Sequence, residues 1–159
     1  MDSVGSRARR QRADEADLVI SSLFSKALKK HPVVSANEVA LAAVGGFGRG
    51  ELSPGSDLDI TIIHSGAVTA DLLSEFVNEI LYPLWDAKLW DAKLRESHPL
   101  KIDHSVRTRS EIRVAAASDL RVALGLLDIR LICGSADLVG AVQVDALESW
   151  QRSSQKRLP

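Results

Sequence analysis

The sequence has little cysteine, almost no net charge and no long apolar run. Its 159 residues include one cysteine, Cys133, so the chain cannot form an internal disulfide bond, which fits the reducing cytoplasm. The net charge of −1 provides no overall basic field to attract nucleic acid. No apolar run approaches the roughly 20 residues that cross a bilayer, and the N-terminus lacks the apolar segment of a secretory signal. We therefore expect a cytoplasmic protein with neither a membrane nor a nucleic acid as partner.

The spacing of the apolar residues divides the chain into three segments. Residues 1–35 are expected to form an N-terminal helix, because apolar residues recur at helical spacing between Asp14 and Lys30. Residues 36–134 alternate strands and helices and are expected to form the core of the domain. Residues 135–159 predict a C-terminal helix, which we expect to lead into a helical domain that is missing from this chain.

The core segment predicts an α+β fold, a small mixed β-sheet flanked by helices. The expected strands are residues 38–44, 58–63 and 101–107. A long amphipathic helix, begun by Ser65 or Thr69, should follow the second strand. Thr108 opens a capping box and a helix over 109–117. A further helix is expected to begin at Ser118 or Asp119 and to continue as far as residue 134.

Two carboxylates lie close together at the start of the second strand. Asp57 and Asp59 are two residues apart, so they point to the same face, while Leu58 and Ile60 point to the core. Like charges on one strand face are unfavourable unless a cation lies between them. Hard oxygen ligands at this spacing suit Mg²⁺. An acidic strand edge facing solvent is the alternative for such a pair taken alone.

A glycine turn precedes this pair and favours the metal-site interpretation. Gly45 and Gly46 end the first strand, and glycine lets backbone N–H groups approach a triphosphate closely. Arg49 is near enough in sequence to bind phosphate. The segment from Gly45 to the carboxylates is too rich in glycine for more than one turn of helix. We therefore predict a site for a nucleotide and its metal.

The third strand contributes a polar face. Asp103, Ser105 and Arg107 alternate with apolar or core-facing residues. Asp103 is the candidate third acid of a two-metal site, where it would bridge a metal or take the proton from an attacking hydroxyl. Arg107 is expected either to contact phosphate or to pair with an aspartate.

Several motifs resemble a known family. The segment GGFGRGELSPGSDLD, from Gly45 to Asp59, is similar to the nucleotidyltransferase superfamily of DNA polymerase beta. The later segments LYPLWD, DHSVRT and LLDIRLICG resemble the N-terminal domain of PII uridylyltransferases, and the Asp-His-Ser form looks like actinobacterial members. The resemblance runs from Val39 to Gly134 and implies a polymerase beta-like nucleotidyltransferase fold.

The resemblance also implies a reaction. Such a domain transfers UMP from UTP, or AMP from ATP, to a tyrosine hydroxyl of the PII signalling protein of nitrogen metabolism and releases pyrophosphate. Asp57 and Asp59 would hold both Mg²⁺ ions. The residues expected along the triphosphate are Gly45, Gly46, Arg49 and Ser56.

The chain also departs from the family. The five residues LWDAK occur twice in tandem over 84–93, and with the loop RESHP they separate the WD and DHSVRT segments. No histidine is followed by aspartate, so a metal-dependent hydrolase motif and the removal of uridylyl groups are expected outside this chain. Two alternatives stay open: a nucleotidyltransferase with a different acceptor, or a truncated, catalytically silent remnant that binds a nucleotide or a partner.

Overall fold

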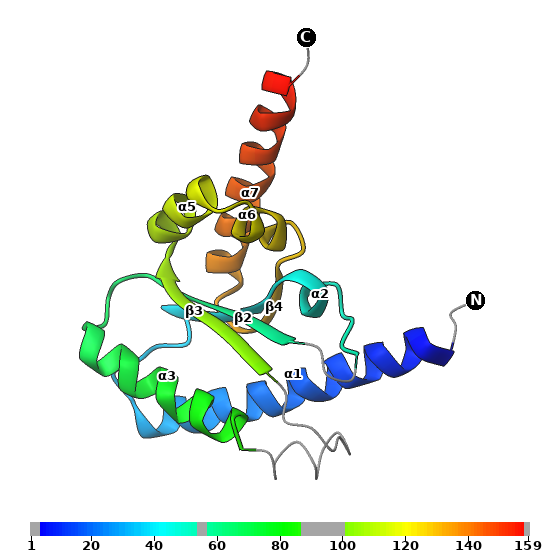
Figure 1. Ribbon diagram of the computed structural model, residues 1–159. Helices are drawn as coiled ribbons and strands as arrows, with labels where there is room; N and C mark the ends of the chain where they lie inside the picture. Colours follow the sequence, from blue (N-terminus) through cyan, green and yellow to red (C-terminus); the bar gives the residue numbers. More distant parts are fainter. Residues whose placement is uncertain (1–3, 54–56, 87–100, 158–159) are drawn as a thin grey trace.

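A four-stranded mixed sheet forms the centre of the molecule (Figure 1). The computed structural model describes residues 4–53, 57–86 and 101–157. The strands are β1 (Val39–Ala43), β2 (Asp57–His64), β3 (Lys101–Thr108) and β4 (Arg130–Gly134), in the order β3-β2-β1-β4. β1 is antiparallel to β2 and β4, whereas β3 runs parallel to β2. The predicted α+β class with a mixed sheet is confirmed.

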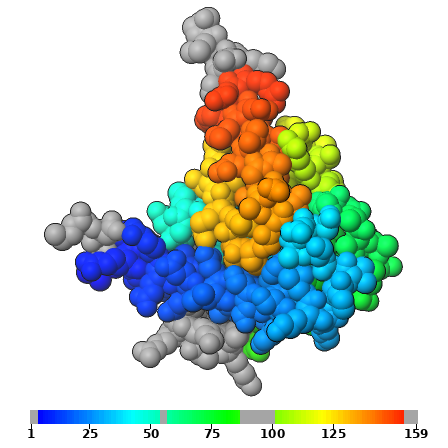
Figure 2. Space-filling model, turned by 180° about the vertical axis from the view of Figure 1, so that it is seen from behind, coloured from blue at the N-terminus to red at the C-terminus, as the bar shows by residue number. Residues whose placement is uncertain are grey.

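Helices cover both faces of the sheet. One face carries α1 (Val4–Lys30) and α3 (Ala70–Leu84), and the other carries α5 (Arg109–Ser118), α6 (Leu120–Leu126) and α7 (Ala136–Arg157). The single turn α2 (Gly45–Gly48) follows β1 directly. Seen from behind, α1 runs across the base of the molecule and α7 projects away from it (Figure 2).

The alternation of side chains along the strands produces two apolar clusters. Leu41, Ile60 and Ile62 pack toward α1 and α3, together with the buried face of each helix. Ala42 and Ile63 point the other way, into a cluster with residues of α5, α6 and α7. β1 is fully buried because it is an inner strand covered on both faces. The carboxylates of β2 therefore have to lie where one of these covering layers opens.

The expectation of one continuous helix up to residue 134 is wrong. Helix α6 ends at Leu126, a turn follows, and Arg130–Gly134 is strand β4, paired with β1. A short apolar run such as LIC does not by itself distinguish a buried helix from a buried strand. Gly134 ends the strand rather than a helix. Its φ is 94°, and a Cβ there would lie 2.3 Å from the carbonyl oxygen of Val39.

The other predicted elements are present, with shifted ends. α1 begins ten residues before Asp14, and Thr69 rather than Ser65 caps α3. The capping box of Thr108 is formed, and Asp119 rather than Ser118 caps α6. Most of the LWDAK repeat and all of the RESHP loop lie outside the described residues. Within the described part of the chain, no helix combines the length and the apolar character needed to cross a membrane.

Candidate active site

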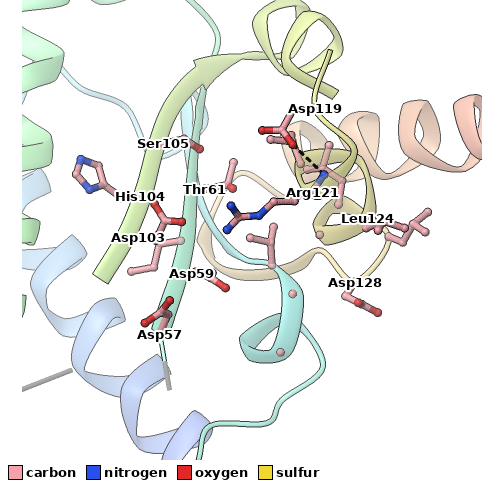
Figure 3. Close-up of a pocket in the computed structure, with 18 of the residues that line it drawn as sticks. Asp57, Asp59, Thr61, Asp103, His104, Ser105, Asp119, Arg121, Leu124 and Asp128 are labelled. Atoms are coloured by element: carbon pink, nitrogen blue, oxygen red, sulfur yellow. Dashed lines mark hydrogen bonds between the residues drawn. The ribbon is translucent and has the colours of Figure 1, made fainter. Parts of the chain in front are cut away.

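A pocket of about 860 Å³ opens between the sheet and α6 (Figure 3). Its walls come from β2, β3, the α2 turn and the segment from α6 to β4. Of the residues predicted for the site, those that line it are Gly45, Gly46, Arg49, Asp57, Asp59, Asp103 and Arg107. Ser56 lies outside the described residues. Residues whose ends, Gly45 and Arg107, are 62 positions apart in the sequence are therefore brought to one cavity.

Three carboxylates lie on the pocket face of two neighbouring strands. Asp59 is the direct register partner of Asp103 across the β2–β3 pair, and Asp57 precedes Asp59 by two residues on the same face. Leu58 and Ile60 are buried on the other side, as the alternation predicts. In parallel strands, register partners lie about 4.8 Å apart, so the two strands bring their acids into one electrostatic neighbourhood.

The negative charges of these acids repel one another. Burial raises the pKa of Asp59 above its usual value, and the negative charges of Asp103 and then Asp57 raise it further. Arg121 acts in the opposite sense and lowers it. A divalent cation stabilises neighbouring like charges of this kind, of which Asp59 is partly buried, so the donor set fits magnesium.

The carboxylates do not form a ready-made cage for that cation. Among the described residues, no three His, Cys, Asp or Glu side chains are gathered closely enough to hold a metal by themselves. This arrangement suits Mg²⁺, which is usually held by one or two carboxylates and completes its shell with water and substrate phosphates. Asp57 and Asp59 are the residues that would hold it, with Asp103 beside them.

The glycine turn lies directly against this acidic group. Gly45 has a φ of 59°, and a Cβ added to it would lie 3.3 Å from Oδ2 of Asp59. The backbone N–H of Val44 donates to the carbonyl oxygen of Asp59 at 3.2 Å, which ties the turn to β2. Backbone at Gly45 and Gly46 can therefore face a phosphate group that is close to the carboxylates.

Arg49 lines the pocket but is held by an acidic partner. Its Nη1 donates to Oδ2 of Asp128 at 2.8 Å, and its Nε lies 3.8 Å from Glu51. Gly48 makes this contact possible, because a Cβ at that position would lie 2.2 Å from the carbonyl oxygen of Asp128. The side chains of Arg49 and Asp128 both line the pocket, and Nη2 of Arg49 lies 3.6 Å from the position of a Cβ built on Gly46.

Arg130 fixes the α2 turn in place, a role that sequence reasoning missed. Its guanidinium donates to the carbonyl oxygens of Phe47 at 2.9 Å and Gly48 at 3.3 Å, and it also pairs with Asp17 of α1. The last carbonyl groups of a helix lack partners within it, and here Arg130 adds to the hydrogen bond that the backbone N–H of Gly50 donates to the Phe47 oxygen at 3.0 Å. Because Arg130 is more than 80 residues from the turn, no local pattern could have identified it.

Two further pocket residues were also missed, Asp119 and Arg121 at the start of α6. The carboxylate of Asp119 accepts a hydrogen bond from the backbone N–H of Arg121 at 2.9 Å. Figure 3 shows the side chain of Arg121 reaching across the pocket toward Thr61 and Asp59. Arg107 is at the other end, four residues beyond Asp103 on β3, or about 13 Å along the strand.

Comparison with known proteins assigns this chain to a family. Residues 15–120 match the family model described as nucleotidyltransferase domain. The chain is 37% identical to a bifunctional uridylyltransferase/uridylyl-removing enzyme of Streptomyces coelicolor over 155 residues, and 38% identical to one of Mycobacterium tuberculosis over 142 residues. These matches cover 98% and 89% of this chain. They cover only 16% of each relative, so the chain spans about a sixth of their length.

Solved structures also show some likeness. A crystal structure of a toxin–antitoxin MntA–HpeT mutant matches with 14% identity and a TM-score of 0.42, covering 83% of this chain and 87% of that one. A toxin–antitoxin structure with AMP-PNP matches with 12% identity and a TM-score of 0.41, covering 86% and 90%.

The match to the family model spans most of the chain and includes the glycine turn and all three carboxylates. This chain belongs to the nucleotidyltransferase domain family.

Proposed function

We propose that this domain transfers a nucleoside monophosphate from UTP or ATP to a tyrosine hydroxyl of a PII signalling protein and releases pyrophosphate. Two observations support the proposal. The matching relatives are named as bifunctional uridylyltransferase/uridylyl-removing enzymes. The observation that carries it is the meeting of Asp57, Asp59 and Asp103 on one face of β2 and β3, beside the glycine turn.

Each group in the pocket has a role in this proposal. Asp57 and Asp59 hold two Mg²⁺ ions, which neutralise phosphate charge when bound. Asp103 either joins them as a ligand or accepts a proton. The groups that lie along the triphosphate are the backbone of Gly45 and Gly46, with the side chains of Arg49 and Arg107. Ser56, which lies outside the described residues, stays a prediction from the sequence. Arg49 reaches phosphate only if it shares its guanidinium with Asp128 or leaves it.

The proposed reaction is a displacement at the α-phosphorus. The acceptor oxygen forms a bond to that phosphorus, the bond from it to the oxygen of the β-phosphate breaks, and pyrophosphate leaves with the electron pair. The proton of the acceptor hydroxyl passes to the carboxylate of Asp103 or to water. Catalysis of this kind depends on positioning and on the neutralisation of charge, so the loss of one carboxylate should reduce it severely.

The test is the intact mass of a purified PII protein after incubation with this chain, Mg²⁺ and either UTP or ATP. The proposal expects a gain of one UMP or AMP per tyrosine, and the nucleotide that supports the gain is thereby identified. Asp57→Asn and Asp59→Asn should abolish it. Asp71→Asn is the matched control, because Asp71 is exposed on α3, across the sheet from the pocket, and its removal should leave the gain intact.

The remaining outcomes separate the alternatives. A gain on another protein or small molecule, but not on PII, would keep the enzyme and replace the acceptor. Binding of the Mg²⁺–nucleotide by folded protein without any transfer would favour the silent remnant. Transfer that survives Asp57→Asn would contradict the assignment of the site.

A further inference from the structure

Arg121 occupies a distinctive place in the pocket. It lies in the first turn of α6, where the cap formed by Asp119 fixes its backbone. Its side chain extends over the sheet toward Asp59 and Thr61 (Figure 3). The acidic group on β2 and β3 therefore faces a guanidinium that comes from the opposite wall of the same pocket.

Several other arginines are held by acidic side chains, whereas Arg107, which also lines the pocket, has no ion pair with the residues that the structure describes. The pairs are Arg49–Asp128, Arg130–Asp17, Arg109–Asp145 and Arg113–Asp145. Among the residues that the structure describes, none forms an ion pair or a hydrogen bond with the guanidinium of Arg121. Its interaction with Asp59 acts at longer range, as an electrostatic effect. The donors of Arg121 are therefore available to a ligand in this pocket.

The register of α6 relates Arg121 to the glycine turn. Gly125 follows it by four residues and so lies on the same face of the helix. A Cβ added to Gly125 would lie 3.9 Å from the backbone nitrogen of Gly45, so this face packs against the turn. The same helix face thus touches the turn with one residue and reaches over the carboxylates with the other.

We propose that Arg121 binds the β- and γ-phosphates of the nucleoside triphosphate and steadies them as the pyrophosphate leaves. The inference rests on the proposed function and assigns a further binding residue to the same site. A planar guanidinium can donate two parallel hydrogen bonds to phosphate oxygens, which gives both affinity and orientation. Arg107 is less suited to this position, because it is about 13 Å further along β3 than Asp103.

The alternative role is a fixed counter-ion that only offsets the charge of Asp59. The two roles differ in what they predict for binding. If Arg121 binds the β- and γ-phosphates, its removal weakens the binding of a triphosphate and of pyrophosphate but hardly affects the binding of a monophosphate. If Arg121 is only a counter-ion, its removal changes the affinity of the site for Mg²⁺. The preference for triphosphate over monophosphate then stays unchanged.

The experiment is calorimetric titration of wild type, Arg121→Gln and Arg121→Lys with UTP, ATP, their monophosphates and inorganic pyrophosphate, all in Mg²⁺. For Arg121→Gln we expect the nucleoside triphosphate that wild type binds, and pyrophosphate, to bind about ten- to a hundred-fold more weakly, the range for a lost charge-assisted contact. Monophosphate binding should change less than about three-fold. Arg121→Lys should recover part of the loss, because it keeps the charge but not the fork of donors.

Arg152→Gln is the matched control, since Arg152 is exposed on α7 and is not among the residues of the pocket. It should bind every ligand as wild type does. Equal weakening of monophosphate and triphosphate by Arg121→Gln, or none at all, would overturn the assignment of Arg121 while leaving the proposed function standing. Failure of folded wild type to bind any Mg²⁺–nucleoside triphosphate would overturn both.

Discussion

Two glycines of the same loop allow a direct test of how the turn supports the carboxylates. Gly45 and Gly50 both adopt positive φ, 59° and 73°. A Cβ on Gly45 would lie 3.3 Å from Oδ2 of Asp59, whereas a Cβ on Gly50 would meet no atom within 4 Å. Gly45→Ala and Gly50→Ala therefore impose a similar backbone strain, but only the first presses on the proposed metal ligand.

The magnitudes follow from these two differences. An L-residue in the left-handed region costs roughly 1–2 kcal/mol, and the smaller entropy of the unfolded chain returns about 0.4–1 kcal/mol. Both variants should thus lose about 1 kcal/mol of unfolding free energy. In Gly45→Ala the carboxylate of Asp59 must also move by a few tenths of an ångström. Since a displacement of about 1 Å can reduce a rate 100-fold, we expect a loss of roughly three- to ten-fold in transfer.

The assay combines urea unfolding with the rate of nucleotide transfer, and with Mg²⁺-dependent binding of the nucleotide as a second readout. Gly45→Ala should lose activity and Gly50→Ala should keep it, at matched stability. The reasoning would be refuted if both variants lost the same activity, because strain in the loop would then explain the result without any contact to Asp59.

Three other predictions concern stability. Gly48→Ala should lower the unfolding free energy in urea by more than about 2 kcal/mol, because its Cβ would overlap the carbonyl oxygen of Asp128. Gly140→Ala, in open space on α7, should raise it by about 0.5–1 kcal/mol. The reverse order of stability would contradict the packing. Asp59→Asn should raise the melting temperature of the metal-free protein, since it removes a half-buried charge that is repelled by Asp103 and Asp57, and it should abolish the rise that Mg²⁺ causes in wild type. A lower melting temperature without metal would argue against repulsion. Hydrogen bonds from Arg109 and then Arg113 hold the pKa of Asp145 well below its usual range. The contribution of ionised Asp145 to the unfolding free energy should therefore be complete above about pH 4 and be lost as the pH falls below that value. Urea unfolding of wild type and Asp145→Asn should differ at pH 7, and the difference should shrink steadily as the pH falls below about 4. A difference independent of pH would show that the ion pairs are not its source.

The sequence was sufficient to predict the acidic strand face. Alternation along β2 places Asp57 and Asp59 together whatever the rest of the fold does, and the same rule selects Asp103 on β3. The glycines that end β1 could likewise be recognised from the local sequence. Strand β4 was missed because its apolar residues satisfy a helix as well as a strand, and its pairing with β1 depends on residues about 90 positions away.

The arginines of the site were harder to predict. Arg49 is adjacent to the turn in sequence, but the partner that holds it, Asp128, comes from a segment that was expected to be helical. Arg121 could not be placed, because its direction depends on where α6 begins and on how that short helix crosses the sheet. Long-range packing, rather than local propensity, determines which cations reach the carboxylates.

The central claim is that Asp57 and Asp59 hold the divalent cation that accompanies a nucleoside triphosphate. The most direct measurement is the anomalous scattering of Mn²⁺ in crystals grown with a non-hydrolysable UTP or ATP analogue. We expect manganese peaks within bonding distance of the Asp57 and Asp59 carboxylates, with the triphosphate between them and the Gly45 turn. Manganese bound elsewhere, or a nucleotide ordered in this pocket with no metal at these two carboxylates, would contradict it.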